Sequence, residues 1–240
     1  MRKLLFAAST LALLTAPVFA ADPIADVASV YDWSGFYAGL NGGYGFGGDD
    51  KVGFRASNGF ANNDVGDLDI AGIFGGAQAG WNFQTGNFVF GLEGDIHLAD
   101  IDDSFSSTFP GIAFKGSSDV DFFGTARLRA GWAFDRLLVY GTGGLAWADV
   151  DYSVAALDAG GNHVNITSND VEFGYAVGGG AEFAINEAWS VKAEYQFIGL
   201  GSEDLTGKVR NAGGALNGVT ANTVMTPSFH TVRVGVNWQF

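Results

Sequence analysis

The residues best suited to acid–base or metal chemistry in this chain are its three histidines, His97, His163 and His230. None lies in an H-E-x-x-H motif, and none stands beside a serine and an acid in an arrangement that would activate a nucleophile. The 240 residues include no cysteine, which excludes thiolate metal sites and a cysteine nucleophile. The sequence therefore predicts a protein that is not an enzyme and that has neither a resident metal nor a cofactor.

Acidic residues occur in three short runs, Asp49-Asp50, Asp100 with Asp102 and Asp103, and Glu203-Asp204. Carboxylates bind Ca²⁺, but these runs lack the spacing of an EF-hand, and we interpret them as solvated loop charge. The chain has 26 acidic and 12 basic residues and a formal charge of −14. Because binding to phosphates needs a basic surface, this balance argues against a nucleic-acid partner.

The N-terminus has the features of an export signal. Arg2 and Lys3 precede an apolar run over residues 4–16, and Val18 and Ala20 are the small residues expected before a cleavage site. We therefore expect residues 1–20 to be a cleaved signal peptide, residues 21–32 a short periplasmic segment and residues 33–240 the folded domain.

Eight segments of the mature chain alternate large apolar residues with small or polar ones, a period typical of β-strands. In a transmembrane barrel the apolar face meets lipid and the polar face lines the lumen, whereas a soluble lipocalin-like barrel has the reverse arrangement. The segments are 34–46, 70–84, 88–101, 120–134, 137–150, 171–185, 188–201 and 229–240. The predicted luminal face carries Glu93, Asp95, Asp121, Arg127, Arg129, Glu172, Glu182, Lys192, Glu194 and Arg233. Asp149 and Asp151 fall on the other face, where we expect them to lie above the hydrocarbon or after a bulge.

The connections between these segments alternate in length. Short ones fall near residues 85–86, 135–136 and 186–187, and long ones near 47–69, 102–119, 153–169 and 202–228. This pattern predicts an all-β fold, an eight-stranded antiparallel transmembrane β-barrel of the outer membrane, with long extracellular loops and both termini in the periplasm. An aromatic girdle is expected at the periplasmic end, formed by Trp33, Trp81, Trp132, Trp189 and Trp238.

Several segments resemble a known family. Residues 33–45 (WSGFYAGLNGGYG), 91–95 (GLEGD), 124–131 (GTARLRAG) and 232–240 (VRVGVNWQF) are similar to segments of the small alphaproteobacterial outer-membrane proteins, which include hemin-binding and opacity-type barrels. The resemblance covers residues 33–240. It implies location in the cell outer membrane, surface exposure, a part in envelope integrity, and contact with outer-membrane lipid and lipopolysaccharide.

The same resemblance suggests particular partners. Phe240 resembles the terminal signal read by the outer-membrane assembly machinery, and the loops are placed to meet host or surface ligands. Hemin is the ligand that the family suggests, and His163 and Tyr152 are the candidate axial ligands.

The lumen of an eight-stranded barrel is just wide enough to be filled by side chains. We expect a luminal charge network in which Glu93 or Asp95 pairs with Arg127 or Arg129, Glu182 with Lys192, and Glu194 with Arg233. The favoured interpretation is a structural outer-membrane barrel with a side-chain-filled lumen. The alternatives are a hemin-binding surface protein, a small-solute or ion porin and, as the weakest, a barrel enzyme.

Overall fold

The computed structural model describes residues 31–47, 50–51, 53–57, 61–62, 67–68, 71–109, 111–201, 203–225 and 228–240. The expected signal peptide, residues 1–20, and residues 21–30 of the expected periplasmic segment lie outside the described residues. Among the described residues, no helix has the length and apolarity needed to cross a membrane.

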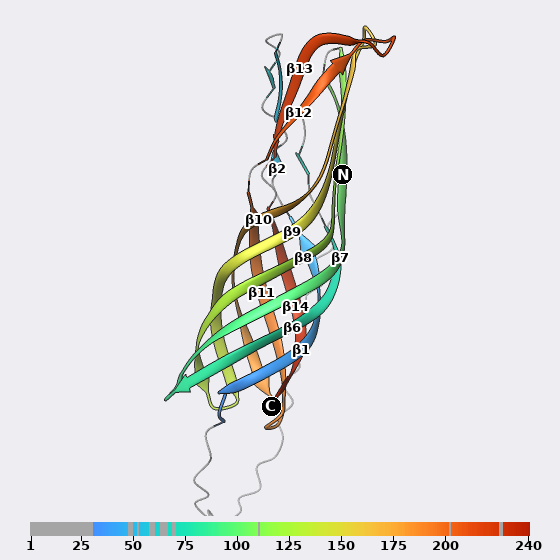
Figure 1. The fold of residues 1–240 in the computed structure, drawn as a ribbon. Coiled ribbons are helices and arrows are strands. Elements are labelled where there is room, and N and C mark those ends of the chain that lie inside the picture. The colour runs from blue at the N-terminus through green and yellow to red at the C-terminus, as the bar shows by residue number, and fades with distance from the viewer. Residues whose placement is uncertain are drawn as a thin grey trace, which may run out of the picture. The chain divides into compact units, whose positions relative to one another are not determined.

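Eight antiparallel strands close into a barrel (Figure 1). Each strand pairs with its neighbour around the barrel, and the ring closes where β14 pairs with β1, with Tyr37 opposite Gln239. The expected eight-stranded barrel is therefore confirmed. Its strands are β1 (Gly35–Phe46), β6 (Ala71–Thr85), β7 (Phe88–Phe109), β8 (Ile112–Phe134), β9 (Leu137–Asp158), β10 (His163–Ala184), β11 (Trp189–Leu200) and β14 (Ser228–Gln239).

Two of the expected long loops are instead strand. Residues 102–109 and 112–119 continue β7 and β8 as a paired hairpin, and residues 153–158 and 163–169 do the same for β9 and β10. The prediction of loops was wrong because it relied on an apolar outer face. Beyond the hydrocarbon this face becomes polar, with Ser104, Ser117, Ser153 and Thr167 aligned across the four strands, while the backbone ladder continues.

The described parts of the other two long connections contain six short strands. β12 (Glu203–Arg210) and β13 (Leu216–Met225) form a hairpin, which joins β10 where His163 pairs with Arg210. β13 in turn pairs with β3 (Gly53–Ala56), and β3 with β4 (Ala61–Asn62). β2 (Asp50–Lys51) and β5 (Asp67–Leu68) form a separate pair.

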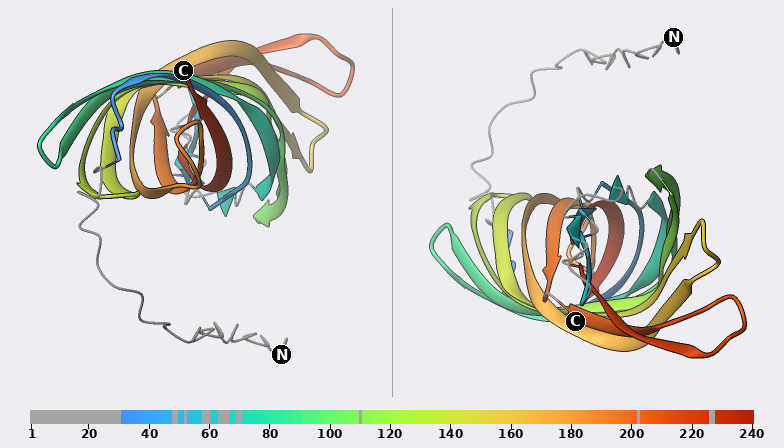
Figure 2. Two further views of the ribbon diagram at one scale, coloured as in Figure 1. Left: turned by 90° about the horizontal axis from the view of Figure 1, so that it is seen from below. Right: turned by 90° about the horizontal axis from the view of Figure 1, so that it is seen from above.

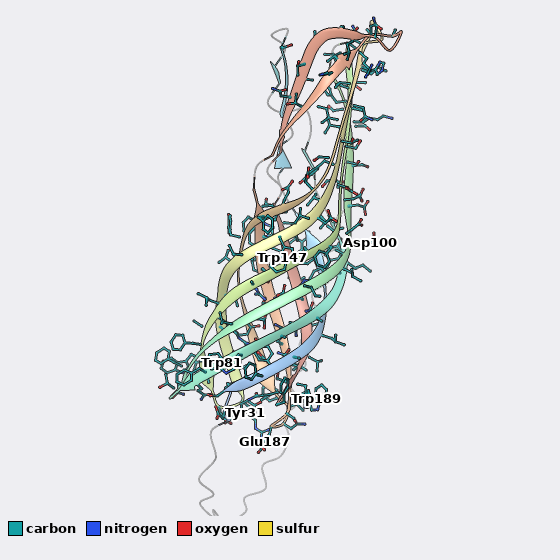
Figure 3. All side chains as sticks on the ribbon, in the orientation of Figure 1. Tyr31, Trp81, Asp100, Trp147, Glu187 and Trp189 are labelled. Carbon is teal, nitrogen blue, oxygen red and sulfur yellow. The ribbon has the colours of Figure 1, made fainter. Side chains whose placement is uncertain are left out.

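The outer surface of the barrel is apolar, as the alternation predicts. Leu40 is 71% exposed and Leu98 73% exposed on this face. Trp81, Trp132, Trp189 and Trp238 are exposed near the end of the barrel that holds the short turns, and Figure 3 labels Trp81 and Trp189 there. Trp33 was expected in the same girdle, but it is 2% exposed and packs inside the barrel mouth.

Two register shifts alter the faces near the outer end of the wall. One lies between Leu98 and Ile101 of β7 and the other between Val120 and Phe122 of β8. One extra residue reverses the alternation that follows it. Asp121, predicted to be luminal, is therefore exposed, and Val120, predicted to face lipid, is buried inside.

The interior has three layers along the barrel, whose ring of strands Figure 2 shows from both ends. A small apolar cluster fills the end with the short turns, and a larger one fills the opposite end and continues between the outer hairpins. Charged side chains occupy the middle. The first cluster contains Tyr31, Trp33, Val89, Ala133, Leu138, Tyr140 and Ala184, and we call it the periplasmic plug.

Close approach of the backbone explains one inward glycine. A Cβ atom on Gly144 would lie 2.1 Å from the carbonyl oxygen of Ala126, whereas one on the neighbouring, outward Gly143 would meet nothing nearer than 4.0 Å. The inward position therefore needs glycine for strand packing, and the outward one does not.

Candidate functional site in the barrel lumen

Eight charged side chains meet in the middle layer of the lumen, and we call them the luminal ion network. They are placed by the period of the strands, because residues two apart on a strand point to the same face. Four carboxylates face four cationic groups, so their formal charges cancel. The members are Glu93 and Asp95 on β7, Arg127 and Arg129 on β8, Glu182 on β10, Lys192 and Glu194 on β11, and Arg233 on β14, each 4% exposed or less.

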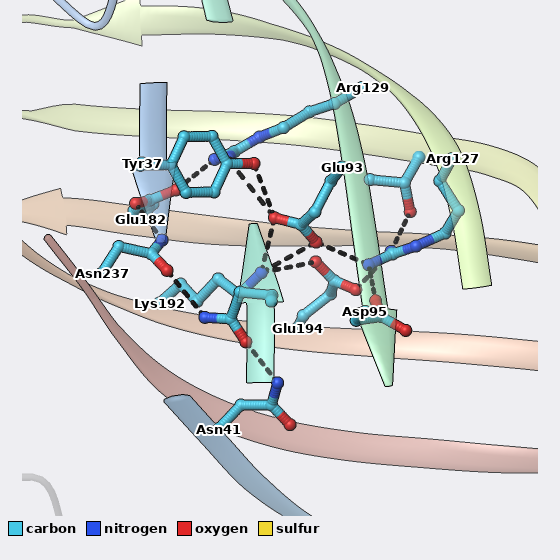
Figure 4. A network of polar contacts seen from close by, with 12 residues as sticks. Tyr37, Asn41, Glu93, Asp95, Arg127, Arg129, Glu182, Lys192, Glu194 and Asn237 are labelled. Atoms are coloured by element: carbon cyan, nitrogen blue, oxygen red, sulfur yellow. Dashed lines mark hydrogen bonds and ion pairs between the residues drawn. The ribbon is translucent and has the colours of Figure 1, made fainter. Parts of the chain in front are cut away.

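Arg127 is the centre of the network (Figure 4). Its Nη2 atom lies 2.6 Å from Glu93 Oε1 and 2.7 Å from Asp95 Oδ2, and its Nη1 atom lies 2.6 Å from Glu194 Oε1. Its remaining Nε–H donates to the hydroxyl of Thr125 at 2.8 Å. One guanidinium therefore joins carboxylates from two strands on different sides of the lumen.

The other cations complete the pairing. Lys192 Nζ lies 2.8 Å from Glu93 Oε2, and the hydroxyl of Tyr37 donates to the same oxygen at 2.7 Å. Arg233 pairs with Glu194 and, at 3.1 Å, with Asp95 Oδ2. These contacts contain the expected pairs of Glu93 and Asp95 with Arg127, and of Glu194 with Arg233.

One expected pair is not formed. Glu182 and Lys192 are register partners on β10 and β11, yet no ion pair joins them among the described residues. Glu182 instead pairs with Arg129 and accepts hydrogen bonds from Ser190 and from Asn237, the last at 2.7 Å. The expected pair was based on adjacent strands. In a narrow barrel, long side chains also reach across the lumen to strands that are not adjacent, as Arg129 of β8 does to Glu182 of β10.

The predicted network contained charged residues alone and left out the neutral side chains of the site. Asn41 donates to Gln78, Gln78 donates to Asn237 at 2.7 Å, and Asn41 lies 2.9 Å from His97 Nε2. The hydroxyl of Tyr140 donates to Glu194 at 2.9 Å. The signal that could have found them is their position, because each is polar at an inward position of the alternation.

An apolar layer covers the network on its outer side. The ring centroids of Phe74 and Phe123 lie 5.1 Å apart, and those of Phe123 and Phe229 lie 5.6 Å apart. The imidazole of His97 stacks on Phe123 at 4.4 Å. His97 thus joins the polar network to this aromatic layer.

The periplasmic plug covers the other side. Residues 31–34 cross the mouth, where the indole N–H of Trp33 donates to the carbonyl oxygen of Asp135 at 3.1 Å. The amide of Tyr31 donates to the Asp135 carboxylate at 3.0 Å, and its hydroxyl donates to Gln239 at 3.1 Å. Asp135 holds a positive φ of 55° in the β8–β9 turn, a conformation that Asp tolerates better than most residues. The turn and the last strand therefore both hold this segment in place.

The two candidate hemin ligands lie apart. Tyr152 is buried on the inner face of β9 opposite Ser168, whereas His163 begins β10 opposite Leu157. Five residues along the ladder correspond to about 17 Å, so one iron could not bind both side chains in this arrangement.

His97, His230 and Phe240 lie in different parts of the barrel. His230 faces outward, with its Nδ1 atom 2.6 Å from the Tyr195 hydroxyl, while His97 lies in the lumen. No cluster of three or more His, Asp or Glu side chains among the described residues is arranged to hold a metal ion. Phe240 is 66% exposed, and its amide donates to the carbonyl oxygen of Phe36 at 3.0 Å.

A closed antiparallel barrel with an apolar outside, aromatic residues near the strand ends and a polar interior is the architecture of an outer-membrane protein. The chain belongs to the family described as outer membrane protein beta-barrel domain, whose model matches residues 6–240. The expected resemblance and the location in the outer membrane are thereby confirmed.

The chain is also similar to two curated relatives and to one solved structure. The chain is 38% identical to the 31 kDa outer-membrane immunogenic protein of Brucella melitensis, over 98% of this chain and 95% of that protein. It is 26% identical to the 25 kDa outer-membrane immunogenic protein of the same organism, over 100% of this chain and 99% of that protein. The structure of the outer membrane protein OprG from Pseudomonas aeruginosa aligns with 86% of this chain and 97% of its own, at 12% identity and a TM-score of 0.44.

Proposed function

We propose that this protein is a non-enzymatic structural barrel that contributes to envelope integrity and carries no solute through its lumen. The single observation behind this proposal is the luminal ion network, whose charges cancel and whose side chains are almost wholly buried.

Passage of ions through the lumen needs a continuous column of water, and the side chains that fill the lumen must be able to move aside. Here Arg127 and Lys192 are both held by Glu93, so opening a path would break several buried ion pairs at once. Removing one partner from a buried pair costs about 3–5 kcal/mol. The apolar layers on both sides of the network add a second barrier, because they offer water no hydrogen-bond partners.

The outer surface supports the rest of the proposal. Outer-membrane lipid and lipopolysaccharide contact the barrel wall, and Phe240 serves as the signal for the assembly machinery. The hairpins of β7–β10 and β12–β13 present their polar outer face to the medium. Two relatives are named outer-membrane immunogenic proteins, and we extend immunogenicity to the present chain.

Electrical recording tests the closed lumen. The refolded full mature chain in planar bilayers should give little or no steady conductance, and liposomes that contain it should not take up sugars. A general porin reconstituted in the same way is the positive control. Stable large openings together with sugar uptake would refute the proposal and indicate a porin.

A hemin titration of the same preparation separates the remaining alternative. The structural proposal predicts no saturable change in the hemin absorption spectrum. A saturable change that is lost in His163→Ala but kept in His230→Ala would indicate a hemin-binding surface protein instead.

A further inference from the structure

Two neutral polar side chains of the lumen, Gln196 and Thr231, differ from the others in their hydrogen bonding. Gln196 on β11 and Thr231 on β14 are each 0% exposed. Within the described part of the chain, the amide nitrogen and oxygen of Gln196 and the hydroxyl of Thr231 have no hydrogen-bond partner. The Nε atom of Arg233 has none either. Buried polar groups in native proteins are nearly always satisfied, so such a group calls for an explanation.

The residues that carry these atoms are neighbours in the sheet. Gln196 and Thr231 are register partners, and both point inward, so their Cβ atoms are neighbours on the same face. Arg233 is two residues from Thr231 on that face. Four unsatisfied polar atoms thus gather on two adjacent strands.

Among the described residues, the positions around these atoms offer no hydrogen-bond partner. The register neighbours on the flanking strands are glycines, Gly178 beside Gln196 and Gly45 beside Thr231, which have no side chain to donate or accept. The next inward residues toward the outer end are Ile198 and Phe229, which are apolar. Below them, the carboxylate of Glu194 is already held by Arg127 and Arg233.

We propose that Gln196, Thr231 and the Nε–H of Arg233 form a binding site for one or two buried water molecules. The chemistry selects water over an ion because the site mixes donors and acceptors. The amide and the hydroxyl each supply both, and the charges nearby already cancel. A water molecule makes two to four hydrogen bonds in such a place, which matches the groups present.

The position of the site encloses its water on both sides along the barrel axis. It lies between the ion network and the aromatic layer of Phe229 and Phe123, so it is a closed pocket of hydration. The lumen is therefore expected to hold water locally without forming a continuous path, and this water should exchange slowly.

Water-selective NMR on the ¹⁵N-labelled full mature chain in detergent micelles tests the site. Cross-peaks from water to the side-chain amide of Gln196 are expected, with the sign of a long-lived water. Gln78 is the matched control, because it is also buried in the lumen but both of its amide atoms have protein partners, Asn41 and Asn237. The cross-peak is assigned to Gln196 if it is lost in the Gln196→Met variant. If the cross-peak persists in Thr231→Val, the magnetisation reaches the amide from water directly and is not relayed through the Thr231 hydroxyl proton. Absence of the Gln196 peak would overturn the proposal.

Thermal unfolding gives a second measurement. If water satisfies these groups, the double variant Gln196→Met with Thr231→Val removes its hydrogen bonds, and Tm falls. If the groups are unsatisfied, the same double variant removes a penalty, and Tm rises. A rise therefore contradicts the proposal. Gln78→Met breaks two direct hydrogen bonds and should lower Tm in either case.

Discussion

Replacing Arg129 with methionine removes the only ion-pair partner that Glu182 has among the described residues. Methionine keeps much of the length of the side chain but not its charge. Glu182 then keeps only the neutral hydrogen bonds from Ser190 and Asn237 in a site that is 4% exposed. We therefore expect Arg129→Met to be among the most destabilising single changes in the barrel wall.

The magnitude follows from two contributions. Leaving a buried charge without its partner costs about 3–5 kcal/mol. The guanidinium of Arg129 also lies over the ring of Tyr140, 3.8 Å from its centroid, a contact worth about 2 kcal/mol when desolvated. Because the retained hydrogen bonds offset part of the loss, we expect a total of about 4 kcal/mol.

A double-mutant cycle isolates the pair. Glu182→Gln alone should cost less, about 2 kcal/mol, because Arg129 keeps the contact with Tyr140 and lies 3.9 Å from Glu93. Combined with Arg129→Met it should cost about 3–4 kcal/mol in place of the sum of about 6, which is a coupling of about 2–3 kcal/mol.

The assay is reversible urea unfolding in lipid vesicles, followed by tryptophan fluorescence. Arg136→Met is the matched control, because that arginine lies in an exposed turn and, among the described residues, its side chain donates only to the carbonyl oxygen of Ile185 at 3.2 Å. It should change stability by no more than about 0.5 kcal/mol. An Arg129→Met variant as stable as the parent, or strictly additive effects in the double variant, would refute the pairing.

Three further predictions concern the periplasmic plug, strand packing and the outer hairpins. Trp33→Ala should cost about 3–5 kcal/mol in the same titration, because it empties the plug, and the lipid-facing Trp81→Ala should cost less. Gly144→Ala should cost about 1–3 kcal/mol because the new methyl group meets backbone, while Gly143→Ala should stay within about 0.5 kcal/mol. Burial, and then the nearby carboxylates, raise the pKa of Asp119, which lies on β8 beyond the hydrocarbon. Asp119→Asn should therefore slow hydrogen exchange of the outer part of the β7–β8 hairpin, where Asp119 lies opposite Asp102, at pH 7.5.

The sign of the last prediction follows from linkage. An acid whose pKa is raised in the folded state stabilises the fold at pH values below its ordinary pKa of 3.8, and this stability is lost as the pH rises through the raised value. The advantage of the asparagine variant should thus be present at neutral pH and disappear in acid. The argument for Asp119 is contradicted if the variant and the parent exchange at equal rates at pH 7.5. The arguments for the periplasmic plug and for strand packing are contradicted if Trp33→Ala costs no more than Trp81→Ala, or if Gly144→Ala costs no more than Gly143→Ala.

The wall of the barrel was predictable from the sequence because its side chains obey a local rule. Each strand crosses a lipid layer with its apolar residues outward, so an alternation of period two identifies both the strands and their luminal faces. Glu93, Arg127 and Lys192 could be placed in the lumen in this way. The rule fails where the lipid ends, and the outer parts of β7–β10 were therefore mistaken for loops.

The sequence by itself determined the architecture, the topology and the composition of the luminal ion network, because each of these depends on residues near one another in the chain. Only the tertiary structure decided which cation pairs with Glu182, and whether Arg127 or Arg129 binds the carboxylates of β7 most closely. Arg129 meets Glu182 across the lumen, and Asp121 leaves it at a bulge that shifts the register by one residue. Trp33 enters the periplasmic plug because distant segments, the β8–β9 turn and the end of β14, hold the chain before β1 inside the mouth. These outcomes depend on barrel closure and strand register, which bring together residues that no local spacing relates.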